Sequence, residues 1–199
     1  MRHLLSPQDL PADARVLLDR AAIDAVLAQM AKDIQAMAWP RDVELAPAER
    51  PRPWLCGIQR GGVAVARELA EVIARDFGWT PQLGAIDVTL YRDDTWLKGP
   101  RAVEGVTRLP GDVNGQRVLL VDDVLYTGRT IRAALNVLMD FGRPEAVRLV
   151  VMADRGGREL PIAADLVGQR LEVARNASAE LCVDGQNRLQ SVIVRPKNP

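Results

Sequence analysis

The sequence predicts an α/β domain of three layers around a largely parallel sheet. Short apolar runs at 54–58 and 117–121 are each followed by a stretch with helical period. Such alternation of strands and helices is typical of parallel sheets covered on both faces. Short connections and right-handed crossovers restrict the topology further. A chain of 199 residues is long enough to bury one sizeable core.

The first half of the chain begins with a predicted helix from Leu18 to Ala38, which Pro40 stops. The segment 41–53 is rich in proline and charge and indicates a surface connection. Residues 54–58 then predict a strand, 59–62 a tight turn and 63–77 a second helix. The apolar residues that give the first helix its period are Ile23, Val26, Leu27, Met30, Ile34 and Met37.

The second half begins with a strand predicted at 83–91, where apolar and polar residues alternate. The polar stretch 92–113 is long for a connection without secondary structure, and such loops often serve as lids. The remaining predicted elements are a strand at 117–121, a helix that ends at Phe141, a strand at 146–152, and short β-like runs at 165–167, 179–183 and 191–194.

The composition excludes several classes of protein. Lys plus Arg and Asp plus Glu both number 26, so no overall positive field attracts DNA or RNA. His3 is the only histidine, which argues against a histidine triad or a zinc site, and Cys56 and Cys182 lie in apolar stretches that predict burial. No apolar run approaches the roughly 20 residues that span a bilayer. Without a signal-peptide pattern either, we expect a cytoplasmic protein with no membrane partner.

The strongest chemical signal follows the strand at 117–121. The apolar run leads into two acids and then into a loop that opens a helix. The N–H groups at a helix start, with the helix dipole, favour a phosphate group. Gly128 permits close backbone approach, and threonine hydroxyls donate hydrogen bonds. The residues of this predicted phosphate site are Val121, Tyr126, Thr127, Gly128, Arg129 and Thr130.

The two acids, Asp122 and Asp123, suit a ribose. Adjacent carboxylates can accept hydrogen bonds from vicinal hydroxyl groups, and they can hold a hydrated Mg²⁺ ion, which prefers oxygen ligands. An isolated Asp-Asp pair more often only starts a helix. Here the acids, the glycine and the hydroxyl groups all stand between a buried strand and a helix, which is the context that such a motif requires. The sequence therefore predicts a sugar-phosphate site.

Three segments together resemble a known family. The segment 118–130 matches the phosphoribosyl pyrophosphate (PRPP) signature of type I phosphoribosyltransferases, and the runs TLYRDD at 89–94 and DRGGRELPI at 154–162 accompany it in order. In this the chain resembles the pyrimidine-operon regulator and uracil phosphoribosyltransferase family, PyrR, from about Leu18 onward. The resemblance implies the type I phosphoribosyltransferase fold, a mostly parallel sheet flanked by helices with a small hood from the chain termini. It places one domain over 1–199, with its core at about 50–155, its hood at about 1–40 and 156–199, and a mobile lid at about 92–112.

The resemblance also implies roles for single residues. Asp122, Asp123 and Arg92 are expected to be catalytic, with Mg²⁺ held by the two acids through water. The turn Gln59, Arg60 and Gly61 is expected to bind pyrophosphate, and Asp154 and Arg155 the base. One position departs from the pattern, because the family's turn carries its arginine where this chain has Gly61. In the lid, Lys98, Arg101 and Arg108 are further candidates for closing over pyrophosphate.

The implied activity joins uracil to PRPP, giving UMP and pyrophosphate, in a homodimer or larger assembly. The rival hypothesis is a UMP-sensing, RNA-binding attenuator with little or no turnover. Zero net charge and Ala28, Lys32 and Met37 on the first helix favour catalysis over RNA binding, although Arg158 fits an RNA contact. Two further alternatives remain: a phosphoribosyltransferase for a purine, orotate or an amide, and a nucleotide-binding domain without turnover.

Overall fold

The computed structural model describes residues 4–11, 13–39, 42, 45, 50–89, 91 and 106–196. Within them a five-stranded sheet has the order β3-β2-β4-β5-β6, and all its neighbours are parallel. A separate three-stranded antiparallel sheet has the order β1-β8-β7. The strands of the main sheet are β2 (Trp54–Ile58), β3 (Leu83–Ile86), β4 (Arg117–Leu125), β5 (Ala146–Asp154) and β6 (Leu166–Arg170).

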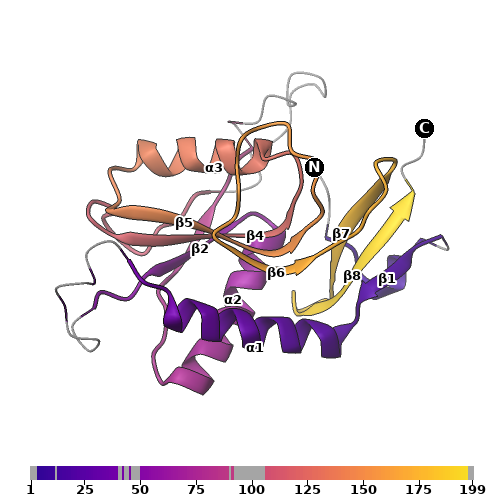
Figure 1. Ribbon diagram of the computed structural model, residues 1–199, viewed down its shortest axis with the longest axis horizontal. Helices are drawn as coiled ribbons and strands as arrows, with labels where there is room; N and C mark the ends of the chain where they lie inside the picture. Colours follow the sequence, from indigo (N-terminus) through magenta and orange to yellow (C-terminus); the bar gives the residue numbers. More distant parts are fainter. Residues whose placement is uncertain are drawn as a thin grey trace.

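Helices cover both faces of the main sheet, as the sequence predicts. Figure 1 shows α1 (Arg20–Ala36) and α2 (Gly61–Phe77) on one face and α3 (Arg129–Asp140) on the other. The side chains of β4 divide between the two resulting cores, because neighbours on a strand point to opposite faces. Leu119 and Val121 pack with α1 and α2, whereas Leu120 packs with α3. The central strand is therefore buried on both sides.

The smaller sheet is the hood, built from both ends of the chain. It consists of β1 (Arg15–Leu18), β7 (Ala177–Val183) and β8 (Leu189–Pro196), preceded by a short 3-10 helix, η1 (Pro7–Asp9). A hood from the chain termini is thus confirmed. The boundaries between core and hood stay a prediction, although β6, from the segment 156–199, lies in the main sheet.

Several boundaries differ from the predicted ones. The strand expected at 83–91 ends at Ile86, because the carboxylate of Asp87 accepts hydrogen bonds from the N–H and hydroxyl of Thr89 and turns the chain. The strand expected to end at Val121 continues to Leu125, paired with β5 along its length. The two acids therefore lie within β4 rather than beyond its end. Strand β1 is absent from the sequence-based prediction.

Two smaller expectations concern burial and membranes. Cys56 and Cys182 are buried free thiols, and burial raises the pKa of Cys56 to about 12, so this thiol stays protonated near neutral pH. Within the described ranges, the structure has no helix that is both long enough and apolar enough to span a membrane.

Candidate active site

The candidate site lies where the parallel strands of the main sheet end. The turn between β2 and α2 contacts β4 directly at this edge. An ideal Cβ atom on Gly61 would lie 2.3 Å from Oδ2 and 2.9 Å from Cβ of Asp123. No side chain fits at that position while Asp123 keeps its place. The structure thus brings together the predicted pyrophosphate turn and one of the two predicted acids.

This contact depends on the absence of a side chain at position 61. A larger residue there would displace Asp123, and the chain instead carries its arginine at position 60. Arg60 is exposed and precedes the first residue of α2. Gln59 is partly buried, and the peptide bond between it and Arg60 is cis.

Asp122 and Asp123 do not share one environment. Because side chains alternate along β4, Asp123 lies on the α2 face and Asp122 on the α3 face. Asp122 is 6% exposed and its Oδ1 accepts from the N–H of Asp123 at 3.0 Å. Asp123 is partly exposed beside the turn. The pair is therefore suited to two different contacts rather than to one shared one.

The predicted phosphate loop leads from β4 into α3. Gly128 occupies the position before the helix with φ of 92°, a backbone conformation that favours glycine. Gly128, the N-cap residue of α3, makes no side-chain capping hydrogen bond. The helix dipole favours an anion at this end of α3. Thr127 Oγ1 accepts from the N–H of Arg129 at 3.3 Å, and Thr127 and Thr130 are both partly exposed.

One predicted residue of this group contributes no side chain to the site. Val121 is fully buried in the core beneath α2. Its carbonyl oxygen would lie 2.2 Å from a Cβ on Gly62, so the backbone of β4 and the start of α2 are in close contact. Any contribution of Val121 to ligand binding is therefore limited to its backbone.

The segment that follows β5 braces the phosphate loop. The N–H groups of Glu159 and Leu160 both donate to the carbonyl of Thr127, at 3.0 and 3.1 Å. The Arg129 guanidinium pairs with the Glu159 carboxylate at 2.7 Å. The loop and the segment therefore form one connected structure, although they are far apart in sequence.

Arg158 is the centre of this brace. Its guanidinium donates to the carbonyl of Tyr126 at 2.7 Å, to the carbonyl of Ile162 at 2.9 Å and to the carboxylate of Asp154 at 2.6 Å. The sequence suggested Arg158 only as an RNA contact, and its intramolecular role was missed. Its place inside the run DRGGRELPI was the one available signal.

Asp154 and Arg155 are the two residues predicted to bind the nucleobase. Asp154 is the last residue of β5, and Arg155 follows it. Burial raises the pKa of Asp154, but the hydrogen bonds from Arg158 and the N–H of Gly156 outweigh this and hold the pKa below its usual range. The guanidinium of Arg155, also buried, donates to the carbonyls of Ala177 at 2.8 Å and Ala174 at 3.2 Å. It also lies 4.1 Å from the ring centroid of Tyr126. Arg155 thus connects the phosphate loop to the hood.

Most of the predicted lid, including Arg92, Lys98 and Arg101, lies outside the described residues. Arg108 is described, and its N–H and carbonyl each bond Ala85 of β3 at 2.8 Å. The main chain at Arg108 is therefore held along the edge of the sheet.

Comparison with known proteins agrees with this geometry. A family model described as a phosphoribosyl transferase domain matches residues 22–182. The Bifunctional protein PyrR of Geobacter sulfurreducens is 39% identical over 183 residues, which cover 92% of this chain and 98% of that protein. The chain belongs to the PyrR family of phosphoribosyltransferases. The Bifunctional protein PyrR of Listeria monocytogenes is 45% identical over 148 residues, or 72% of this chain and 80% of the relative.

Solved structures of more distant proteins share the fold of this chain. The hypoxanthine phosphoribosyltransferase of Trypanosoma cruzi in complex with IMP matches with a TM-score of 0.66 at 21% identity, over 94% of this chain and 96% of that one. The HGPRT-ase of Leishmania tarentolae in complex with GMP matches with a TM-score of 0.64 at 20% identity, over 94% of this chain and 100% of that one. The type I phosphoribosyltransferase fold is therefore confirmed.

Proposed function

We propose that this PyrR-family protein is a uracil phosphoribosyltransferase, which converts uracil and PRPP to UMP and pyrophosphate. The observation that carries the proposal is the contact between Gly61 and Asp123. It places an acid of the PRPP signature against the turn expected to receive the leaving group. The N-terminus of α3, with Gly128 as its N-cap residue, follows β4 in the chain. One substrate that carries a 5′-phosphate, a ribose and a pyrophosphate suits all three features.

In this proposal, different residues bind different parts of PRPP. The loop from Tyr126 to Thr130 holds the 5′-phosphate with backbone N–H groups and hydroxyls. Asp122 and Asp123 accept hydrogen bonds from the ribose hydroxyls, and the turn at Arg60 and Gly61 faces the pyrophosphate. We infer that Asp123, beside the turn, holds Mg²⁺ through water. When bound, that ion neutralises charge on the pyrophosphate as it departs.

The reaction is a displacement at the anomeric carbon through an oxocarbenium-like transition state. The bond from that carbon to the pyrophosphate oxygen breaks, a bond to the uracil nitrogen forms, and the proton of that nitrogen passes to the departing pyrophosphate. Catalysis rests on positioning and electrostatic stabilisation, so no covalent nucleophile is required. We propose that Arg92 closes over the leaving group, and that Asp154 and Arg155 lie on the side of the site that binds uracil. Arg155 contributes there by holding Tyr126 against the hood.

The test is a nucleotide-formation assay with PRPP, Mg²⁺ and, separately, uracil, orotate, hypoxanthine and guanine. The proposal predicts UMP from uracil, no product from the other bases, and loss of product with a chelator. Product from orotate or a purine would reassign the substrate. Absence of turnover with every base, while PRPP or UMP still binds, would instead indicate a nucleotide sensor.

RNA binding is the second candidate, because relatives in the PyrR family are called bifunctional. The Arg158 side chain, expected to contact RNA, is engaged within the protein. We therefore rank catalysis first. A pyrimidine-operon leader RNA that binds more tightly with UMP, and more weakly as salt rises, would establish the second activity. A homodimer or larger assembly is part of the same proposal and is tested by sedimentation.

A further inference from the structure

A buried carboxylate joins the hood to the helix that begins at the pyrophosphate turn. Glu68 lies on α2, about two turns beyond Gly61, and is 2% exposed. A charge so far from water is stabilised only by close partners. The proposed reaction assigns Glu68 no part, so its burial calls for another explanation.

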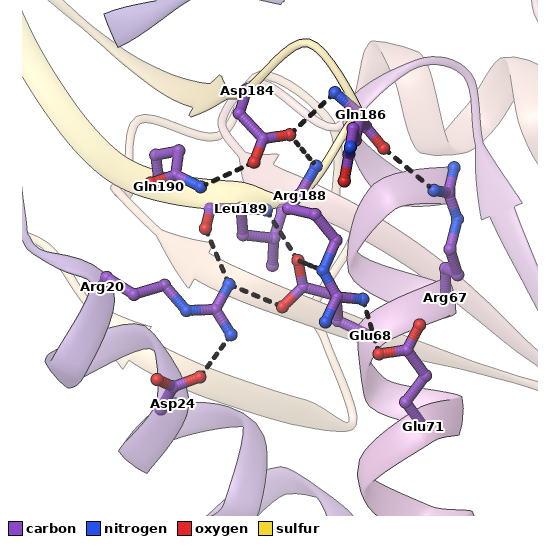
Figure 2. Close-up of polar contacts among 10 residues, drawn as sticks. All are labelled: Arg20, Asp24, Arg67, Glu68, Glu71, Asp184, Gln186, Arg188, Leu189 and Gln190. Atoms are coloured by element: carbon purple, nitrogen blue, oxygen red, sulfur yellow. Dashed lines mark hydrogen bonds and ion pairs between the residues drawn. The ribbon is translucent and has the colours of Figure 1, made fainter.

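The partners of Glu68 come from α1, from β8 and from the turn before β8, where Nε of Arg188 lies 3.8 Å from Oε1. Arg20 of α1 donates to Oε2 at 2.7 Å, and the N–H of Leu189 in β8 donates to Oε1 at 2.6 Å. Arg20 also donates to the carbonyl of Leu189 at 2.7 Å, which closes the set of contacts (Figure 2). One carboxylate therefore fixes the start of β8 against both helices.

The hairpin between β7 and β8 is organised by a second carboxylate. Asp184 accepts from the N–H groups of Gln186 and Arg188 at 2.9 Å and from the amide of Gln190 at 3.1 Å. These bonds hold the pKa of Asp184 below its usual range, chiefly through the N–H of Arg188. Arg67 of α2 donates to the carbonyl of Gln186 at 3.3 Å, as Figure 2 shows. The hairpin is thus attached to the side of α2.

The hairpin faces the pyrophosphate turn across a pocket. Asp184, Gly185 and Asn187 line it together with Arg60, and its volume is about 260 Å³. Arg60 immediately precedes α2, and Glu68 fixes the hairpin to the same helix. The distance between the turn and the hairpin is therefore set through α2.

We propose that Glu68 is a positioning residue that holds the β7–β8 hairpin opposite the pyrophosphate turn, so that the hairpin forms the outer wall of the pyrophosphate subsite. This inference rests on the proposed function. The carboxylate is required because both of its oxygens accept hydrogen bonds. In Glu68→Gln, one of them becomes an NH₂ group facing a donor, so one contact is lost and the hairpin shifts.

The experiment is calorimetric binding of PRPP, inorganic pyrophosphate and UMP, each with Mg²⁺. UMP carries no pyrophosphate and therefore reports on the rest of the site. Glu68→Gln is expected to weaken PRPP and pyrophosphate binding roughly tenfold through misplacement of the wall, with UMP binding unchanged. The matched control is Glu71→Gln, which makes the same change on the same helix. Glu71 also pairs with Arg188, but its side chain is 51% exposed, and all three affinities should persist.

Equal weakening of all three ligands by Glu68→Gln would overturn the proposal, because it would indicate general loosening of the fold. Unchanged pyrophosphate binding would overturn it as well. If Glu68→Gln does not fold, Asp184→Ala in the hairpin must show the same selective loss. A wild-type protein that binds all three ligands yet forms no UMP would remove the proposed function, while the binding comparison would still decide the role of Glu68.

Discussion

Asp122 and Asp123 are neighbours in sequence, but their side chains lie on opposite faces of β4. One is buried on the α3 face of β4, and the other lies beside Gly61 on the α2 face. The sequence-based prediction assigns both acids to one Mg²⁺ ion. We propose instead that their roles differ, because Asp123 lies beside the turn proposed to bind pyrophosphate and Asp122 is buried.

This separation predicts different effects of Asp123→Asn and Asp122→Asn. Asp123→Asn should raise the Mg²⁺ concentration for half-maximal UMP formation about tenfold, as expected when a ligand acts through water. Asp122→Asn should lower kcat and leave the Mg²⁺ dependence as in wild type. Titration of Mg²⁺ at saturating uracil and PRPP measures both. The same Mg²⁺ shift in both variants would show that the acids act as one ligand set.

Gly61→Ala tests the close contact at the turn. The added Cβ would meet Asp123 at 2.3 Å from Oδ2, so either the carboxylate or the turn must move. We expect kcat/KM for PRPP to fall about 100-fold, the loss typical of a displacement near 1 Å at reacting groups. Steady-state kinetics with varied PRPP measure it. A variant with wild-type kcat/KM would show that the turn has room to spare.

At the scale of elements, the phosphate loop depends on the segment that follows β5. Arg158 bonds two backbone carbonyls and the carboxylate of Asp154. Arg158→Lys keeps the charge but cannot make all three contacts. We expect the free energy of unfolding to fall by about 2 kcal/mol, because charged hydrogen bonds to half-buried groups are lost.

Urea unfolding measures this change, and Arg75→Lys is its control. Arg75 pairs with Asp76 on the exposed side of α2, where solvent screens the pair, so Arg75→Lys should change the free energy of unfolding far less than Arg158→Lys. Similar losses in the two variants would mean that Arg158 does not brace the loop.

The elements themselves were largely predictable from sequence. Apolar runs and helical periods indicated β2, α2, α3 and β5, because their burial patterns follow from single stretches of chain. Strand β1 was missed because two of its four residues are exposed. The extension of β4 through Asp122 was missed because pairing with β5 keeps acids in a strand, where the sequence alone suggests its end.

The site was predictable only in part, for a related reason. The PRPP signature allows the phosphate loop to be predicted, because the residues of that loop stand in one continuous segment. The contacts of Gly61 with Asp123, and of Glu68 with Leu189, join residues far apart in the chain. No local pattern marks such pairs. The role proposed for Glu68 in particular depends on the packing of α2 against the hood, which the sequence does not show.

At the scale of the whole molecule, a buried ion pair makes stability depend on pH. Arg117, at the start of β4, lies 2.5 Å from the carboxylate of Asp42, and both side chains are at most 5% exposed. Burial raises the pKa of Asp42, but hydrogen bonds from Arg117 and the N–H of Trp39 outweigh it and hold the pKa below its usual range. The folded protein therefore binds this proton less readily than the unfolded chain.

Stability from this pair is present above the unfolded pKa of about 3.9 and is lost as pH falls through the folded value. We expect the free energy of unfolding to decrease steadily below about pH 5. Asp42→Asn should lower the free energy of unfolding by about 3 kcal/mol at pH 7, since it leaves Arg117 without its nearest opposite charge. It should also make the free energy of unfolding fall less steeply at acid pH. Urea unfolding at several pH values measures both effects, and an acid limb as steep as in wild type would contradict the assignment.

The order β1-β8-β7 has a consequence for how the protein is made. Strand β8 lies between the other two strands of the hood, yet the ribosome synthesises it after both. The main sheet has all its strands once Arg170 has emerged, so it can assemble while the hood still lacks its central member. Until β8 arrives, β1 lacks the strand with which it pairs and Glu68 lacks the N–H of Leu189. Emergence of β8, rather than formation of the main sheet, therefore decides when the proposed pyrophosphate wall first exists.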